Sequence, residues 1–146
     1  MNPLSPNLAA PTGHSARRIL VIDDEPAFTR LLKINLDATG RYLVHTVNDS
    51  VQALPAALEF RPELVLLDVM MPELDGGDVA NQFQKHPKLA RVPIIFLTAT
   101  VRHSEVDAHD GIIGGLRFLA KPIDLAELLD CLDTQFGEPD RPAPTR

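Results

Sequence analysis

The chain has 146 residues, of which 45% are hydrophobic and 23% are charged, and its formal net charge is -6. These proportions are typical of one globular domain, and the negative charge disfavours DNA or RNA as a direct partner. The single cysteine, Cys131, excludes an intramolecular disulfide and a metal site built from several cysteines. The sequence contains neither a membrane-spanning apolar run nor a secretory leader, so the expected location is the cytoplasm.

Proline is concentrated at the two ends of the chain. Six of the 13 prolines lie in residues 1–16 and 137–146. Neither end carries enough apolar side chains to offset the entropy of ordering it, so both are expected to be flexible tails. The folded domain is therefore predicted to span residues 17–136.

Short apolar runs alternate with helical patterns along this domain. The predicted strands cover residues 19–22, 42–47, 64–67, 93–97 and 116–120. Apolar residues at helical spacing lie after them: Phe28, Leu32 and Leu36, then Val79 and Phe83, then Leu125, Leu128, Leu129, Leu132 and Phe136. A further helix is expected over residues 51–60, where Pro55 should kink or shorten it. Strand and helix alternate five times, which predicts an α/β fold with helices on both faces of a sheet.

Polar side chains follow four of these strands. They are Asp23, Asp24, Asp68, Thr98 and Lys121. Ligands bind beside the carboxyl ends of strands in open parallel sheets. Two carboxylates ~4 Å apart repel by about 4 kcal/mol at an effective dielectric of 20, and a hard cation such as Mg²⁺ removes that penalty. A carboxylate can also attack phosphorus, and an ammonium and a hydroxyl group can then orient the charged oxygens.

Each of these residues also has an ordinary structural explanation. The acidic pair before Pro26 is compatible with a simple helix N-terminus, and Asp68 with a turn at a strand end. Lys121–Pro122 is compatible with a turn before the last helix, with Asp124 as its cap. Five polar residues in order at four strand ends are hard to obtain by chance, and together they favour a phosphoryl-transfer site.

The motifs that carry these residues resemble a known family. They read ILVIDDEP (19–26), LVLLDVMMPELDG (64–76), PIIFLTA (93–99) and FLAKP (118–122). They are similar to the receiver domain of bacterial two-component response regulators, and the resemblance covers residues 17–136. It implies a doubly wound (βα)5 flavodoxin-like fold, with a five-stranded parallel sheet of order 2-1-3-4-5.

The resemblance also implies a phosphoacceptor and a metal site. Asp68 would take a phosphoryl group from a sensor histidine kinase or a histidine phosphotransfer protein. Mg²⁺ would be held by Asp23, Asp24, Asp68 and the backbone carbonyl of Met70.

Three further residues receive roles from the resemblance. Lys121 would pair with the phosphoryl oxygens, and its bond to Pro122 would be cis. Thr98 would hydrogen-bond the phosphoryl group, and Phe118 would rotate together with it as an aromatic switch. The fourth helix and its glycine-containing exit loop, between Thr98 and Lys121, would be the usual output surface, but they do not name a partner.

The expected function is a stand-alone receiver that signals by contact with an unknown downstream protein, because no output module follows residue 136. It would be a monomer or weak dimer and no enzyme in the usual sense, since it only promotes its own phosphorylation and dephosphorylation. One alternative is a Mg²⁺-dependent phosphohydrolase with Asp68 as nucleophile, although Met70 stands where the haloacid-dehalogenase type has a second Asp. Another is a constitutive interaction module, although every site residue is present.

Overall fold

The computed structural model describes residues 16–99, 112–113 and 116–137, the pair 112–113 by its backbone alone. The chain divides into two compact units, residues 1–96 and 97–146. The expected tails, apart from Ala16 and Gly137, and most of the expected fourth helix lie outside the described residues.

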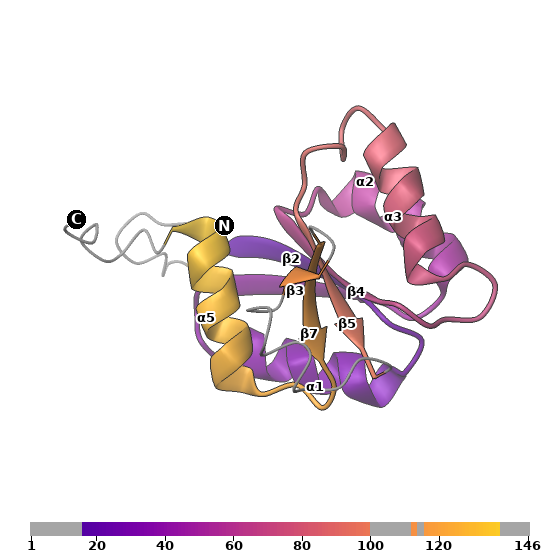
Figure 1. The fold of residues 1–146 in the computed structure, drawn as a ribbon. Helices are drawn as coiled ribbons and strands as arrows, with labels where there is room; N and C mark the ends of the chain where they lie inside the picture. Colours follow the sequence, from indigo (N-terminus) through magenta and orange to yellow (C-terminus); the bar gives the residue numbers. More distant parts are fainter. Residues whose placement is uncertain (1–15, 100–111, 114–115, 138–146) are drawn as a thin grey trace, which may run out of the picture. The chain divides into compact units, whose positions relative to one another are not determined.

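The strands form one sheet of order β3-β2-β4-β5-β7-β6 (Figure 1). Their bounds are β2 Arg17–Ile22, β3 Tyr42–Val47, β4 Leu64–Asp68, β5 Ile94–Thr98, β6 Ile112–Ile113 and β7 Leu116–Ala120. The five predicted strands therefore have the predicted order 2-1-3-4-5, and the doubly wound, flavodoxin-like fold is confirmed. Asp68 and Thr98 are the last residues of their strands rather than the residues after them.

A sixth strand was not predicted. β6 pairs antiparallel with β7, with Ile112 opposite Arg117 and Ile113 opposite Leu116. Two residues are too short to show an alternating pattern, so periodicity alone could not reveal this strand.

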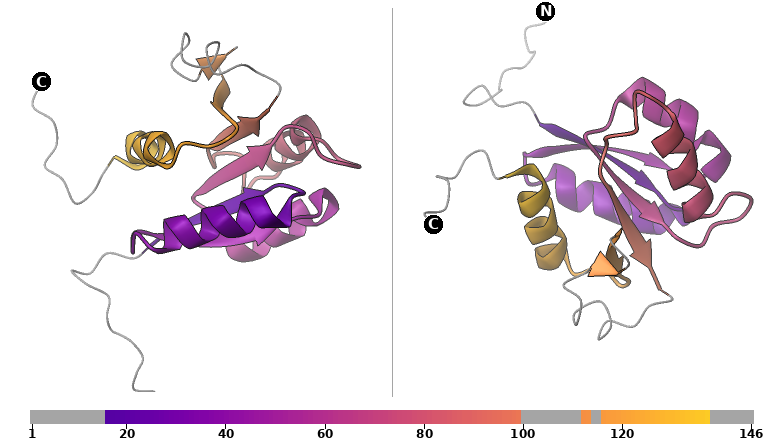
Figure 2. Two further views of the ribbon diagram at one scale, coloured as in Figure 1. Left: turned by 90° about the horizontal axis from the view of Figure 1, so that it is seen from below. Right: turned by 45° about the horizontal axis from the view of Figure 1, so that its top comes forward.

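β2 is the central strand of the first unit and pairs in parallel with β3 and β4. Residues 19–22 of β2 and 64–67 of β4 are fully buried, as expected for parallel strands covered on both faces. The helix α1 (Pro26–Asp37) lies on one face of these strands, and α2 (Ala53–Phe60) and α3 (Gly76–Lys85) lie side by side on the other (Figures 1 and 2).

The helix α1 has the predicted start and the predicted buried face. Pro26 occupies its first turn, and Leu32 and Leu36 are buried. Two of its polar side chains reach the end strand of the sheet: Asp37 Oδ1 accepts the Val44 amide at 3.2 Å, and Lys33 Nζ donates to the Val44 carbonyl at 2.8 Å. The Lys33–Asp37 ion pair, at 2.8 Å, thus occupies the hydrogen-bonding groups that a further strand would use.

The expected helix over residues 51–60 is shortened, as Pro55 predicts. A 3₁₀ turn, η2 (Ser50–Gln52), comes first, and the Asp49 side chain accepts the Val51 amide at its start. α2 then begins at Ala53, so Pro55 lies in its first turn. Amides of a first turn have no partner within the helix, which makes proline tolerable there.

The second unit carries the last helix, α5 (Leu125–Phe136). The predicted cap is confirmed, because Asp124 Oδ1 accepts the amides of Ala126 at 2.9 Å and Glu127 at 3.4 Å. Leu128 and Leu132 of the predicted stripe are fully buried. The Lys121–Pro122 peptide bond is cis, as the resemblance implies. In the part of the chain that the structure describes, no helix is both long and apolar enough to cross a bilayer.

Candidate phosphoacceptor and metal site

Three carboxylates meet at the carboxyl ends of β2 and β4. An oxygen atom of each of Asp23, Asp24 and Asp68 lies within 4.8 Å of the other two. The parallel register explains this, because Ile22 lies opposite Leu67 and the next residues of the two strands are Asp23 and Asp68. The carboxylate cluster predicted from the sequence is confirmed for these three residues.

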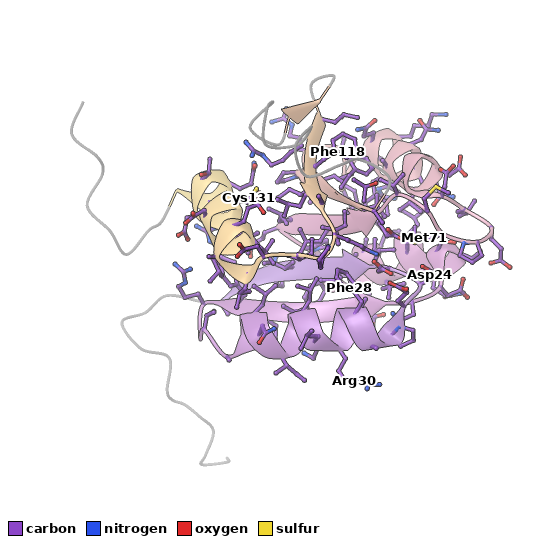
Figure 3. The ribbon with its side chains drawn as sticks, turned by 60° about the horizontal axis from the view of Figure 1, so that its bottom comes forward. Asp24, Phe28, Arg30, Met71, Phe118 and Cys131 are labelled. Atoms are coloured by element: carbon purple, nitrogen blue, oxygen red, sulfur yellow. The ribbon has the colours of Figure 1, made fainter. Side chains whose placement is uncertain are left out.

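The cluster is mostly shielded from water. Asp23 is 0% and Asp68 is 5% exposed, whereas Asp24 is partly exposed. Asp24 and Met71, from the loops after β2 and β4, lie at the same end of the first unit (Figure 3). Carboxylates that are buried together need positive charge to offset their desolvation and repulsion. A donor set made of oxygen atoms suits a hard cation such as Mg²⁺, so these residues fit the predicted metal.

The acidic loop after β2 is fixed by hydrogen bonds that the sequence did not predict. Asp23 Oδ1 accepts the Glu25 amide at 3.0 Å. Asn48 Nδ2, from the loop after β3, donates to the Asp23 carbonyl at 2.8 Å and to the Thr29 hydroxyl at 3.0 Å. Asn48 and Thr29 belong to no motif. The pairing of β2 with β3 brings Asn48 to Asp23, and Thr29 lies on α1, which follows the acidic loop.

Gly76, the first residue of α3, lies directly against the end of β4. Its amide donates to the Val69 carbonyl at 2.8 Å. A Cβ atom at this position would lie 2.6 Å from the Asp68 carbonyl oxygen and 2.9 Å from Val69 Cα. Only glycine fits without displacing the backbone of Asp68 and Val69.

The remaining predicted residues belong partly to the loop after β4 and partly to the second unit. The Met70 side chain is 64% exposed, and the role of the Met70 carbonyl stays a prediction. In the second unit, the Lys121 amide donates to the Thr98 carbonyl at 2.8 Å, which joins the ends of β7 and β5. Thr98 is buried, and Lys121 and Phe118 are half-buried. Their action on a phosphoryl group also stays a prediction.

A doubly wound sheet with buried carboxylates at the ends of two strands is the arrangement that the resemblance to receiver domains implies. The family model described as "Response regulator receiver domain" matches residues 19–133. The chain therefore belongs to the family of response regulator receiver domains, which act in two-component systems.

Two known proteins with similar sequences are longer than this chain. The DNA-binding dual master transcriptional regulator RpaA of Synechocystis is 34% identical over 125 residues, which is 85% of this chain and 51% of RpaA. The response regulator PleD of Caulobacter vibrioides is 40% identical over 108 residues, which is 73% of this chain and 23% of PleD. The chain thus spans about half or less of the length of these two relatives, and their activities as whole proteins are not transferred to it.

Alignments of this chain with two solved structures of similar fold cover those structures completely. The receiver domain of the sensor histidine kinase PA1611 of Pseudomonas aeruginosa, described with a magnesium ion coordinated in its active site cleft, has a TM-score of 0.70 and 30% identity. The alignment covers 85% of this chain and 100% of that one. A putative response regulator from Chloroflexus aurantiacus has a TM-score of 0.71 and 26% identity, with the same coverage.

Proposed function

We propose that this receiver accepts a phosphoryl group on Asp68 from the phosphohistidine of a histidine kinase or a histidine phosphotransfer protein, and that it then signals by protein–protein contact. The observation that carries the proposal is the position of Asp68. Its carboxylate ends a buried strand, is 5% exposed, and has oxygen atoms of two other carboxylates within 4.8 Å.

In the proposed reaction a carboxylate oxygen of Asp68 attacks the phosphorus atom. The phosphorus–nitrogen bond to histidine breaks, its electron pair goes to the imidazole, and an acyl phosphate forms on Asp68. Hydrolysis of this acyl phosphate returns the free carboxylate. The chain in this proposal is a switch that promotes both steps on its own Asp68.

Asp23, Asp24, Asp68 and the backbone carbonyl of Met70 would hold Mg²⁺. When bound, the ion would supply positive charge that offsets the repulsion between these carboxylates and the phosphoryl oxygens. The remaining charge would be met by the Lys121 ammonium group, and the Thr98 hydroxyl would donate a hydrogen bond to a phosphoryl oxygen.

The proposed output begins at Thr98. Its hydroxyl would move toward the phosphoryl group, and the half-buried ring of Phe118 would turn inward with it. Phenylalanine has no hydroxyl group, so an outward ring position gains no hydrogen bond. Such a change would alter the surface offered to a downstream protein in the cytoplasm, whether the receiver stands alone, as a monomer or weak dimer, or is attached to other domains.

Incubation of the full chain with acetyl phosphate and Mg²⁺, followed by intact mass measurement, tests the proposal. We expect an increase by one phosphoryl group, which disappears in Asp68→Ala and when EDTA replaces Mg²⁺. Asp130→Ala is the matched control, because Asp130 is exposed on α5, and it should keep the adduct. Absence of an adduct in the unsubstituted chain would refute phosphoryl acceptance. Sustained hydrolysis of phosphomonoesters that requires Asp68 would instead favour the phosphohydrolase.

A further inference from the structure

The loop between β4 and α3 contains a tight turn with unusual backbone geometry. The Leu74 amide donates to the Pro72 carbonyl at 2.8 Å, and Glu73 between them has a φ of 71°. A hydrogen bond from residue i+2 to residue i around a positive φ defines the rare and strained form of the γ-turn. A non-glycine residue keeps such a conformation only when its surroundings hold it there.

Ser50 holds both ends of this turn. Its hydroxyl donates to the Pro72 carbonyl at 2.9 Å and accepts the Leu74 amide at 3.2 Å. Ser50 is 3% exposed, and it begins η2, 22 residues before Pro72 in the sequence. The serine thus joins two elements that are distant in sequence, and a single buried hydroxyl meets the donor and the acceptor of the turn.

The turn lies in the segment that carries the expected metal ligand. Met70 precedes Pro72 by two residues, and the far end of the loop is fixed where the Gly76 amide meets the Val69 carbonyl. With both its base and its tip held, the segment between them has few conformations left. The Ser50 hydroxyl thus restrains the far part of the loop that contains Met70.

We propose that Ser50 is a positioning residue for the cation: it holds the γ-turn at Glu73 and thereby the Met70 carbonyl that would complete the Mg²⁺ site. The inference rests on the proposed function. Without the hydroxyl, Glu73 can relax to an ordinary φ and the Met70 carbonyl is no longer held, while Asp23, Asp24 and Asp68 keep their places. Removal of a group that orients a metal ligand typically lowers the metal affinity by 10–100-fold.

Calorimetric titration of the full chain with MgCl₂ tests this role. Ser50→Ala should weaken Mg²⁺ binding about tenfold. The Mg²⁺ concentration for half-maximal phosphorylation by acetyl phosphate should rise equally, with the maximal rate at saturating Mg²⁺ retained. Ser50→Thr, which keeps the hydroxyl, should restore most of the affinity. Ser50→Cys keeps a side chain of similar size whose thiol is a weak hydrogen-bond donor, so its Mg²⁺ affinity should lie between those of Ser50→Ala and the unsubstituted chain. This variant replaces Ser50→Ala in the measurement if Ser50→Ala does not fold.

Thr39 provides the matched control, because its hydroxyl also bridges two backbone groups. It donates to the Leu36 carbonyl at 2.7 Å and accepts the Arg41 amide at 3.1 Å, at the end of α1. Thr39→Ala should lower the thermal unfolding temperature measured in EDTA, as Ser50→Ala should, but leave the Mg²⁺ affinity unchanged.

Two results separate this inference from the proposed function. Unchanged Mg²⁺ affinity in Ser50→Ala and Ser50→Cys, or an equal loss in Thr39→Ala, would overturn the role of Ser50 even if Asp68 is phosphorylated. Weakened Mg²⁺ binding in Ser50→Ala, with no phosphorylation of the unsubstituted chain, would support the role of Ser50 and refute the proposed function.

Discussion

Replacement of Gly76 by alanine should directly disturb the end of β4, the strand that carries Asp68. The new Cβ would lie 2.6 Å from the Asp68 carbonyl oxygen, whereas ordinary contact begins at 3.4 Å. The obstacle is backbone, so no side-chain rotation can relieve the clash, and either the end of β4 or the start of α3 must move. Overpacking of this kind lowers the free energy of unfolding by about 1–3 kcal/mol. The better helix propensity of alanine offsets at most about 1 kcal/mol of this loss.

The neighbouring glycine is an internal control for this prediction. A Cβ at Gly77 would meet only the Asp75 carboxylate oxygen, at 3.3 Å, so this side chain, which also accepts the Asp78 amide at 2.9 Å, need move by only a few tenths of an ångström. Urea unfolding followed by circular dichroism should show a free energy of unfolding lower by about 1–2 kcal/mol for Gly76→Ala and unchanged or slightly higher for Gly77→Ala. Phosphorylation by acetyl phosphate should slow in Gly76→Ala alone. If the two variants are equally stable and equally fast, the steric argument is wrong.

Further predictions concern three parts of the chain away from the carboxylate cluster. Lys33→Ala combined with Asp37→Ala frees the amide and carbonyl of Val44 on an end strand, and sedimentation velocity should show more self-association than in the unsubstituted chain at equal concentration. Burial raises the pKa of the Cys131 thiol above its ordinary 9.0, so at neutral pH it should react with iodoacetamide more slowly when folded than in urea. Because the folded state disfavours the thiolate, the free energy of unfolding should also fall as the pH rises above 9.0. A Cys131→Ala variant should not show this part of the pH dependence. Asp124→Ala removes the cap of α5 and should lower the free energy of unfolding by about 1 kcal/mol in urea titration; no change would show that the two capping bonds contribute nothing.

Local patterns were sufficient for most of the fold. Buried strands such as β4 appear as unbroken apolar runs because both faces are covered, and α5 shows its buried face as a stripe of leucines. The shortening of α2 by Pro55 and the cap at Asp124 could also be predicted, because each depends on the chemistry of one residue and its nearest neighbours. β6 escaped prediction because two residues carry no period.

The sequence by itself also determined that the carboxylates of Asp23, Asp24 and Asp68 come together, since acids at the carboxyl ends of neighbouring parallel strands lie at one edge of the sheet. Only the tertiary structure decided what holds them. Asn48 donates a hydrogen bond to the Asp23 carbonyl, and the Ser50 hydroxyl bonds to both ends of the turn at Glu73. Gly76, which has no side chain, lets α3 pack directly against the backbone of Asp68. These contacts join residues that are distant in the chain and belong to no repeating pattern, and they arise only when strand pairing and helix packing bring the elements together.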